Sequence, residues 1–279
     1  MVECGGLENR CGLWSPGVRI PLSLLYNLPK SRKVFLFIRK MKDTKIFFTG
    51  RKEICENTFS FTFNLYDSDY DFKPGQYAHF TIMDPVHHDE NGYTRPLSFA
   101  NSPDHINSLM VAARKSQSVF IENLLSLTPG SELQISEPEG EISLHRDDTV
   151  ENVFIAGGIG ITPVRSIVEF ATENDLKNRI TLFYSNKSLS QAAFMNELLE
   201  WSAENENFRF IPFFESDEMI SEFEHEKGKI DSERLKKHLG DFDNKIFFLI
   251  GPPAMVDSFK DILLNQNVSE ENIKTEKFK

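Results

Sequence analysis

The first half of the chain alternates apolar and polar residues at the period of a β-strand. Between Thr58 and Phe63, hydroxyl side chains alternate with phenylalanine, which is typical of a strand with one buried face. Similar strands are expected over residues 45–49, 77–82, 109–113 and 132–136, with a turn at 73–76 and one helix over residues 119–127. Short strands at regular spacing with one inserted helix predict a small antiparallel β-barrel.

After the charged segment 145–148 the pattern changes to continuous apolar runs separated by helical periodicity. The runs at 153–156, 180–184, 208–212 and 246–250 predict strands buried on both faces, and helices are expected over 164–171, 192–201 and 255–264. This alternation predicts a doubly wound parallel α/β sheet. The expected division is a barrel domain over residues 42–147 and an α/β domain over residues 148–279.

The first forty residues differ from both halves. They carry seven Lys or Arg and only two Glu, contain Pro16, Pro21 and Pro29, and show no sustained periodicity. We expect residues 1–41 to be a poorly ordered extension, with Met41 opening the functional protein. An organelle transit peptide is the weaker alternative, because the prolines interrupt any amphipathic helix.

Composition excludes several classes of function. A net charge of −11 offers no field for nucleic acid or an anionic membrane, and no apolar run is long enough for a membrane span. Three cysteines cannot form a disulfide framework or ligate a four-cysteine iron–sulfur cluster, which favours a reduced, cytoplasmic compartment. No metal site is expected, because His87 and His88, with Asp84 and Asp89, read as a polar loop.

A glycine-rich turn follows the first strand of the parallel sheet and opens a helix. Its sequence is Gly157-Gly158-Ile159-Gly160-Ile161-Thr162-Pro163. Glycines let a backbone approach a pyrophosphate, and a helix N-terminus supplies free N–H groups. Thr162 is the expected N-cap and Pro163 the expected first helical residue. The turn predicts dinucleotide binding, with a purely structural turn as the alternative, because the third glycine of the common fingerprint is absent.

Two further segments carry candidate chemistry. In Arg95-Pro96-Leu97-Ser98, an arginine that can reach a phosphate stands beside a strand that can bond a ring edge, although an ordinary surface strand would look the same. Gly251-Pro252-Pro253-Ala254-Met255 follows the last parallel strand. It is expected to border the same crevice as the glycine-rich turn, unless it is only a strand-to-helix corner.

The order of these motifs resembles the ferredoxin–NADP reductase superfamily. The resemblance rests on Arg95–Ser98, Thr128-Pro129-Gly130, Glu137-Pro138-Glu139-Gly140, the glycine-rich turn and Gly251-Pro252-Pro253, and it covers about Lys45 to Lys279. It implies a flavin-binding barrel, usually holding FAD, joined to a nicotinamide-nucleotide domain. Hydride would pass between NADPH or NADH and the flavin, and electrons would leave to a separate redox partner protein or a small-molecule acceptor.

The resemblance also assigns roles to residues. Arg95 would contact the flavin phosphate, while Pro96, Leu97 and Ser98 would lie along the isoalloxazine. Val111, Ala112 and Ala113 would line the next strand, and Ser116, Gln117, Ser118 and Val119 would bind flavin phosphates at a helix N-terminus. Gly157, Gly158, Gly160, Ile161, Thr162 and Pro163 would hold the nucleotide, with Gly251 and Pro252 beside its nicotinamide. The candidate catalytic residues are Ser98, Glu276 and Phe278.

Departures from the superfamily pattern leave alternatives open. Ile250 stands where many members have cysteine, and Glu137 where they often have glycine. Ser116 and Ser118 replace the usual glycine of the phosphate-binding helix start, so FMN remains possible beside FAD. Ser185, Asn186 and Lys187 suit the 2′-phosphate of NADPH, although they could be a solvated loop. The rival functions are an electron-transfer subunit active only with a partner enzyme, and a nucleotide-binding module without flavin.

Overall fold

The structure is a computed structural model that describes residues 43–66, 69–88, 90–216 and 220–278. The predicted extension over residues 1–41 lies outside these ranges. Residues 43–279 belong to one compact unit. Within the described ranges, no helix has the length and apolar character needed to cross a bilayer.

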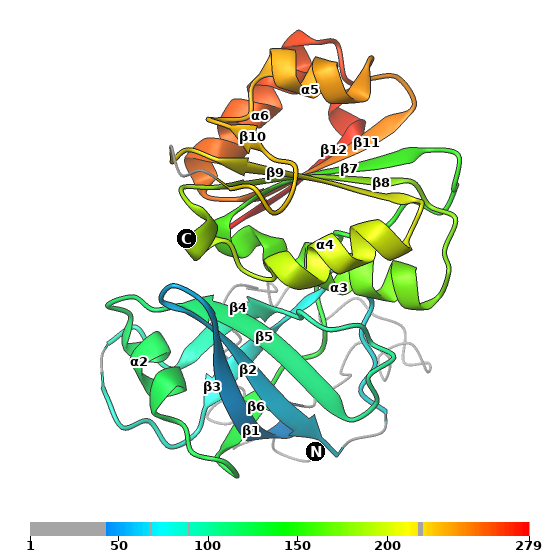
Figure 1. Ribbon diagram of the computed structural model, residues 1–279. Coiled ribbons are helices and arrows are strands. Elements are labelled where there is room, and N and C mark those ends of the chain that lie inside the picture. Colours follow the sequence, from blue (N-terminus) through cyan, green and yellow to red (C-terminus); the bar gives the residue numbers. More distant parts are fainter. Residues whose placement is uncertain (1–42, 67–68, 89, 217–219, 279) are drawn as a thin grey trace, which may run out of the picture. The chain divides into compact units, whose positions relative to one another are not determined.

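The first half forms a six-stranded antiparallel sheet with the order β4-β3-β6-β1-β2-β5 (Figure 1). Its elements are β1 (Thr44–Cys55), β2 (Thr58–Leu65), β3 (Tyr77–Ile82), β4 (Thr94–Ser98), β5 (Ser108–Arg114), α2 (Val119–Ser126) and β6 (Glu132–Ile135). The two edge strands approach each other through a single bridge between Phe99 and Val111, so the sheet is barrel-like without a continuous closing ladder. This confirms the predicted architecture.

Phenylalanine fills the interior of this sheet. Phe61 and Phe63 are fully buried, and they are the apolar members of the alternating pattern in β2. The ring of Phe63 lies 5.7 Å from the rings of both Phe48 and Phe80. Large, stiff aromatic side chains on alternate strand positions thus fill the space enclosed by the curved sheet.

The second half forms a six-stranded parallel sheet with the order β10-β9-β8-β7-β11-β12. Its strands are β7 (Glu151–Gly157), β8 (Ile180–Asn186), β9 (Phe208–Phe214), β10 (Glu226–Lys227), β11 (Lys245–Gly251) and β12 (Ile273–Lys277). Its helices are α3 (Ile161–Glu173), α4 (Met195–Glu204), α5 (Ser232–Leu239) and α6 (Pro253–Asn265), with short 3₁₀ turns η2 (Gly158–Gly160), η3 (Leu189–Gln191) and η4 (Glu270–Asn272). The doubly wound prediction is confirmed.

The helices cover both faces of the parallel sheet, as the continuous apolar runs require. Alternate residues of one strand point to opposite cores: Phe154 packs in the core that contains α3 and α4, whereas Val153 and Ile155 pack in the core that contains α5 and α6. Figure 1 shows α3 and α4 on the side of the sheet that faces the barrel. Ala100, Ala112 and Ile142, which precede β7 in the chain, join that core. The predicted boundary between residues 147 and 148 stays a prediction.

Helix boundaries differ from the expectation at α4. The predicted helix began at residue 192, but α4 begins at Met195. Phe194 adopts a left-handed conformation with φ of 62°, which a regular helix cannot continue through. The helix predicted over 255–264 starts at Pro253, and a proline fits that first position because no intrahelical N–H bond is needed there.

Candidate active site

The glycine-rich turn lies against the turn that follows β11. A Cβ on Gly160 would come within 2.5 Å of the carbonyl oxygen of Ile250, and a Cβ on Gly157 would come within 2.5 Å of Met255 Sδ. Only glycine permits this approach of the backbone. The two turns that the sequence analysis selected therefore meet at the carboxyl edge of the parallel sheet, as predicted. Ile250 itself is fully buried.

The predicted helix cap was wrong. The N-cap of α3 is Gly160, which follows the 3₁₀ turn η2, and no side chain caps the helix. Thr162 is the second helical residue and donates its hydroxyl to the carbonyl of Ile159 at 2.8 Å. Pro163 is therefore the third helical residue, where its missing N–H still costs no intrahelical hydrogen bond. The extra 3₁₀ turn explains the displacement, and it leaves the first N–H groups of α3 without a side-chain acceptor.

Arg114 reaches the glycine-rich turn from the barrel. Gly158 has φ of +53°, and the nearest heavy atom to an added Cβ would be Arg114 Nη2 at 3.8 Å. The same Nη2 donates to the carbonyl of Gln191 at 3.2 Å, which holds the guanidinium beside the turn. The sequence analysis missed Arg114. The available signal was a charged residue directly after the small-residue strand positions Ala112 and Ala113.

Tyr184 in β8 hydrogen-bonds the backbone of the glycine-rich turn. Its hydroxyl donates to the carbonyl of Gly158 at 3.2 Å and accepts from the backbone N–H of Ala193 at 3.0 Å. Complete burial raises the pKa of this hydroxyl, so it stays protonated as a donor. The turn is thus held by a buried hydroxyl from β8 as well as by its own backbone.

Ser98 and Glu276 meet where the barrel adjoins the parallel sheet. Ser98 ends β4 and is 4% exposed, while Glu276 pairs with Ile250 in the β11–β12 ladder. The Ser98 hydroxyl donates to Glu276 Oε1 at 3.3 Å. Burial raises the pKa of Glu276 from an ordinary 4.5 to about 7, and the Ser98 hydrogen bond opposes part of that rise. The carboxyl group can therefore be protonated or ionised near neutral pH.

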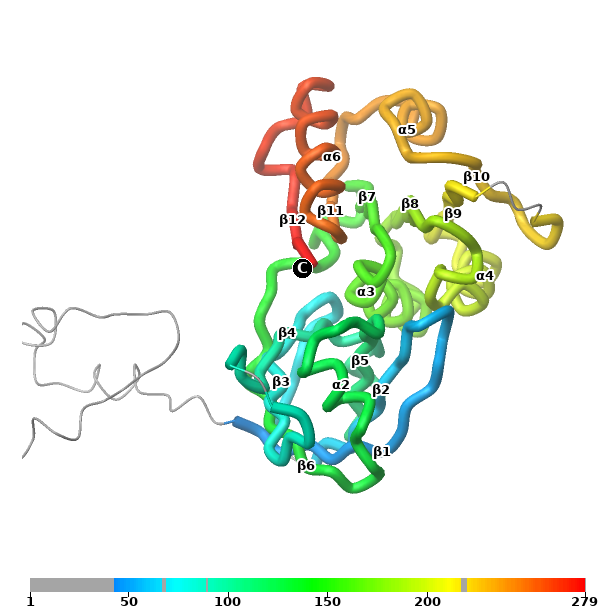
Figure 2. Tube along the Cα trace, turned by 90° about the vertical axis from the view of Figure 1, so that its left-hand side faces the viewer, coloured from blue at the N-terminus to red at the C-terminus, as the bar shows by residue number. Residues whose placement is uncertain are grey.

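The segment that follows Glu276 also reaches the crevice. The backbone N–H of Phe278 donates to the carbonyl of Gly251 at 2.9 Å, and its ring packs against the core that contains α3. Figure 2 shows the end of β12 directed toward β4. Glu276 also lines a cavity of about 530 Å³, together with Tyr77, Gly140, Ile142 and the rest of β12. The structure thus brings together Ser98, Glu276, Phe278 and Gly251.

Arg95 lies beside the start of α2. Its guanidinium donates to the carbonyls of Asn91 at 3.1 Å and Thr94 at 2.7 Å, and lies 5.9 Å from the ring centroid of Phe120 in α2. No side chain caps α2 at Ser118. An arginine next to an uncapped helix N-terminus is suited to an anion. Ser116 and Gln117 lie in the exposed loop before the helix, and Val111, Ala112 and Ala113 lie buried in β5.

The remaining predicted residues lie at the carboxyl end of β8. Ser185 is partly buried, Asn186 is buried and Lys187 is exposed. Among the described residues, the side-chain nitrogen of Asn186 makes no hydrogen bond. A buried donor without a partner costs free energy unless a ligand or water completes it. This edge of the sheet therefore places a buried amide beside an exposed ammonium group.

Comparisons with known proteins agree with this geometry. Residues 154–261 match the family described as "Oxidoreductase NAD-binding domain". The phenol hydroxylase P5 protein of Acinetobacter pittii is 27% identical over 76% of this chain and 59% of its own length. The crystal structure of a ferredoxin NADP⁺ reductase from Neisseria gonorrhoeae with bound FAD and NADP superposes with a TM-score of 0.70 at 20% identity, over 85% of this chain and 98% of that one.

The chain thus has the fold of the ferredoxin–NADP reductases, with a domain similar to the oxidoreductase NAD-binding family over residues 154–261. A further relative, the flavohemoprotein of Oceanobacillus iheyensis, is 26% identical over 74% of this chain and 51% of its own length. The chain thus spans between half and three fifths of the length of these curated relatives. The superfamily fold accounts for the barrel-like sheet followed by the parallel sheet, and for the two glycine turns that face each other.

Proposed function

We propose that this protein is a flavin-dependent oxidoreductase that transfers hydride between NAD(P)H and bound FAD and passes electrons to a separate acceptor. The observation that carries the proposal is the hydrogen bond between Ser98 and Glu276. It joins the end of the proposed flavin strand to the β11–β12 edge, one residue from Gly251 and its contact with the glycine-rich turn. Two segments from different sheets, each proposed to bind a cofactor, therefore meet at one point.

The barrel residues fit a flavin nucleotide. Arg95 and the uncapped start of α2 would hold its phosphates, because both present donors at one place. Leu97 and Ser98 would lie along the ring system, with Val111, Ala112 and Ala113 on the adjacent strand. When bound, the flavin supplies the hydride chemistry, and the protein supplies position and a dry surface. FAD is the proposed form, by likeness to the superfamily.

The parallel-sheet residues fit a nicotinamide dinucleotide. The backbone at Gly158 and the neighbouring Arg114 guanidinium would bind the pyrophosphate, since they combine an approachable backbone with a bidentate donor. Asn186 and Lys187 would contact the ribose end, where an amide donor and an ammonium group favour a 2′-phosphate. We therefore propose NADPH as the preferred donor over NADH.

Glu276 would hold a proton at the flavin edge. With a pKa of about 7, its Oε1 can accept or release a proton through the Ser98 hydroxyl without a large energetic cost near neutral pH. The adjacent cavity gives this carboxyl group a side open to water. Ser98 and Glu276 would thus exchange protons with solvent, separately from the hydride transfer between nicotinamide and flavin.

The acceptor is proposed to be a separate protein or small molecule. The 279 residues contain three cysteines, fewer than the four thiolates that a ferredoxin-type [2Fe–2S] cluster needs. Cys55 is a free thiol, which fits a reducing compartment such as the cytoplasm. Several relatives carry names that pair them with an oxygenase, such as "Terephthalate 1,2-dioxygenase, reductase component 1" of a Comamonas species.

The test begins with the colour of the purified protein. Yellow protein that NADPH bleaches faster than NADH supports the proposal, whereas colourless protein that takes up neither FAD nor FMN on reconstitution makes it a binding module. Arg95→Ala should lose flavin during gel filtration. Arg51→Ala is the matched control, since Arg51 lies in the same sheet and also donates to a backbone carbonyl, that of Leu127. Full retention of flavin by Arg95→Ala contradicts the assigned phosphate site.

A further inference from the structure

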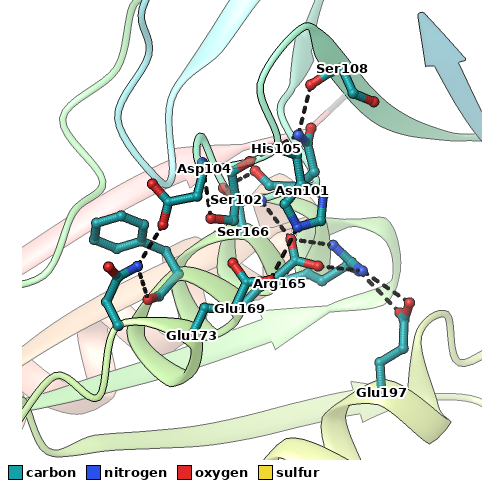
Figure 3. A network of polar contacts seen from close by, with 12 residues as sticks. Asn101, Ser102, Asp104, His105, Ser108, Arg165, Ser166, Glu169, Glu173 and Glu197 are labelled. Carbon is teal, nitrogen blue, oxygen red and sulfur yellow. Dashed lines mark hydrogen bonds and ion pairs between the residues drawn. The ribbon is translucent and has the colours of Figure 1, made fainter.

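Helix α3 holds the loop that follows β4 through a buried arginine. Arg165 Nη1 donates to the carbonyl of Ala100 at 2.6 Å and to Glu169 Oε2 at 3.0 Å (Figure 3). The same Glu169 oxygen accepts the backbone N–H of Ser102. Arg165 and Glu169 are both buried, at 4% and 5% exposure. Two adjacent turns of α3 thus bond two backbone groups of one loop.

Two further side chains extend this connection along the loop. Ser166 Oγ donates to the carbonyl of Asn101 at 2.7 Å. Asn101 in turn uses its side chain to fix the loop internally, since it donates to the carbonyl of Ser108 at 2.9 Å and accepts from the N–H of Met110 at 2.7 Å. The loop between β4 and β5 is therefore rigid, and its position is set by α3.

Helix α4 orients the arginine from the other side. Glu197 Oε1 lies 2.9 Å from Arg165 Nη2, and the rings of Phe194 and Trp201 each have their centroid 5.1 Å from the guanidinium carbon. Burial alone lowers the pKa of Arg165, but the hydrogen bonds and charges of Glu197 and Glu169 raise it above its ordinary value. A buried ion pair contributes little net stability compared with apolar packing, so its benefit lies in fixing one geometry.

The connection spans the two segments that the proposed function assigns to the two cofactors. Ala100 follows Ser98 by two residues, and Arg165 follows Gly160 of the glycine-rich turn by five residues, little more than one helical turn. A shift of α3 relative to the loop would move the end of β4 relative to that turn. Hydride transfer depends on distance so steeply that a displacement of about 1 Å can cost about 100-fold in rate.

We propose that Arg165, together with Ser166, is a positioning residue that sets the distance between the flavin strand and the nucleotide turn. The proposal rests on the proposed function. It assigns no cofactor contact to Arg165, which acts through Ala100 and Glu169. A cation site at His105, Glu169 and Glu173, whose ligand atoms lie within 4.8 Å of one another, is the weaker interpretation, because Glu169 is already used by Arg165 and Ser102.

The test compares Arg165→Met, Arg165→Lys and Ser166→Ala with wild type in the flavin-loaded protein. Arg234→Met is the matched control, since Arg234 also bonds a carboxylate and backbone carbonyls but lies on α5, on the other face of the sheet. Three quantities are measured: the rate of flavin reduction at saturating NADPH, the dissociation constant of NADP⁺, and the long-wavelength charge-transfer absorbance that reports stacking of nicotinamide on flavin.

Arg165→Met should lower the saturated reduction rate by at least about tenfold, because positioning sets near-attack geometry, and should weaken the charge-transfer absorbance. The dissociation constant should change less than about threefold, since α3 keeps its N-terminal groups. Arg165→Lys should recover part of the rate, because an ammonium can still bond Ala100 and Glu169. Arg234→Met should match wild type.

An unchanged reduction rate and charge-transfer absorbance in Arg165→Met would overturn the inference. So would an effect confined to the dissociation constant of NADP⁺. If Arg165→Met does not fold, Ser166→Ala decides, since it removes one hydrogen bond and should slow reduction by about threefold. The proposed function fails separately, when wild type itself takes up no flavin or is not reduced.

Discussion

Replacing Glu276 with glutamine should make the stability of the protein less dependent on pH. Glu276 has its pKa raised by burial from 4.5 to about 7 in the folded protein. Between these values the folded state binds a proton that the unfolded state has released. Stability contributed by this group is therefore complete below about pH 4.5 and is lost as the pH rises through about 7. Glutamine carries no charge at either limit.

The size of this change in stability follows from the shift in the pKa of Glu276. The difference between 4.5 and about 7 corresponds to about 3 kcal/mol, at about 1.4 kcal/mol for each pH unit. Relative to wild type, Glu276→Gln should therefore gain up to about 3 kcal/mol in the free energy of unfolding between about pH 5 and about pH 8.5. Urea denaturation at both pH values measures it, with equal m-values as the condition for comparison.

Glu271→Gln provides the matched control for this experiment. Glu271 lies exposed on η4 and undergoes the same change of charge close to the same strand. The reasoning is refuted if Glu276→Gln and wild type differ in the free energy of unfolding by the same amount at both pH values. Ser98→Ala gives an internal check, since it removes the hydrogen bond that lowers the pKa of Glu276. The loss of stability should then continue to a higher pH.

Four further substitutions probe the glycine-rich turn. Arg114→Ala should weaken NADP⁺ binding by about tenfold or more, because it removes a charge-assisted hydrogen bond, and should have little effect on the saturated reduction rate. A nucleotide titration followed by flavin absorbance measures the dissociation constant and the rate. Gly160→Ala should lower the melting temperature more than Gly158→Ala, because its Cβ meets backbone at 2.5 Å, whereas a Cβ on Gly158 makes only ordinary contact with Arg114 at 3.8 Å and only the φ of Gly158 is unfavourable. Equal losses would contradict this packing. Tyr184→Phe should cost about 1–3 kcal/mol in urea denaturation, since two backbone groups lose their partner.

The fold was predictable from periodicity wherever a strand or helix has its own apolar pattern. The Thr58–Phe63 alternation and the runs at 153–156 and 246–250 all became strands of the expected kind. Strand β12 has no such pattern, since Ile273–Lys277 contains one buried apolar residue among polar ones. It forms because the edge of β11 offers unpaired backbone groups, which is a property of the assembled sheet.

The segments that form the site could be predicted from the sequence, but the side-chain contacts that join them could not. Glycines, the Arg95–Ser98 strand and the Glu276–Phe278 segment could be selected because each has a local signature or a resemblance. Arg165 has neither, and the signal at Arg114 is only its place after two alanines; an arginine at the end of a strand or inside a helix usually points to solvent. Thr162 failed as a cap because the extra 3₁₀ turn was invisible to a helical pattern. These contacts depend on where two sheets meet.

Helix α3 begins at the nucleotide turn and bonds the loop after Ser98 through Arg165 and Ser166. Helix α3 therefore contacts both segments to which cofactors are proposed to bind. By thermodynamic linkage, any factor by which the first ligand tightens binding of the second must equal the factor by which the second tightens binding of the first. Where that factor exceeds one, a higher concentration of the nucleotide increases the fraction of the protein that holds its flavin.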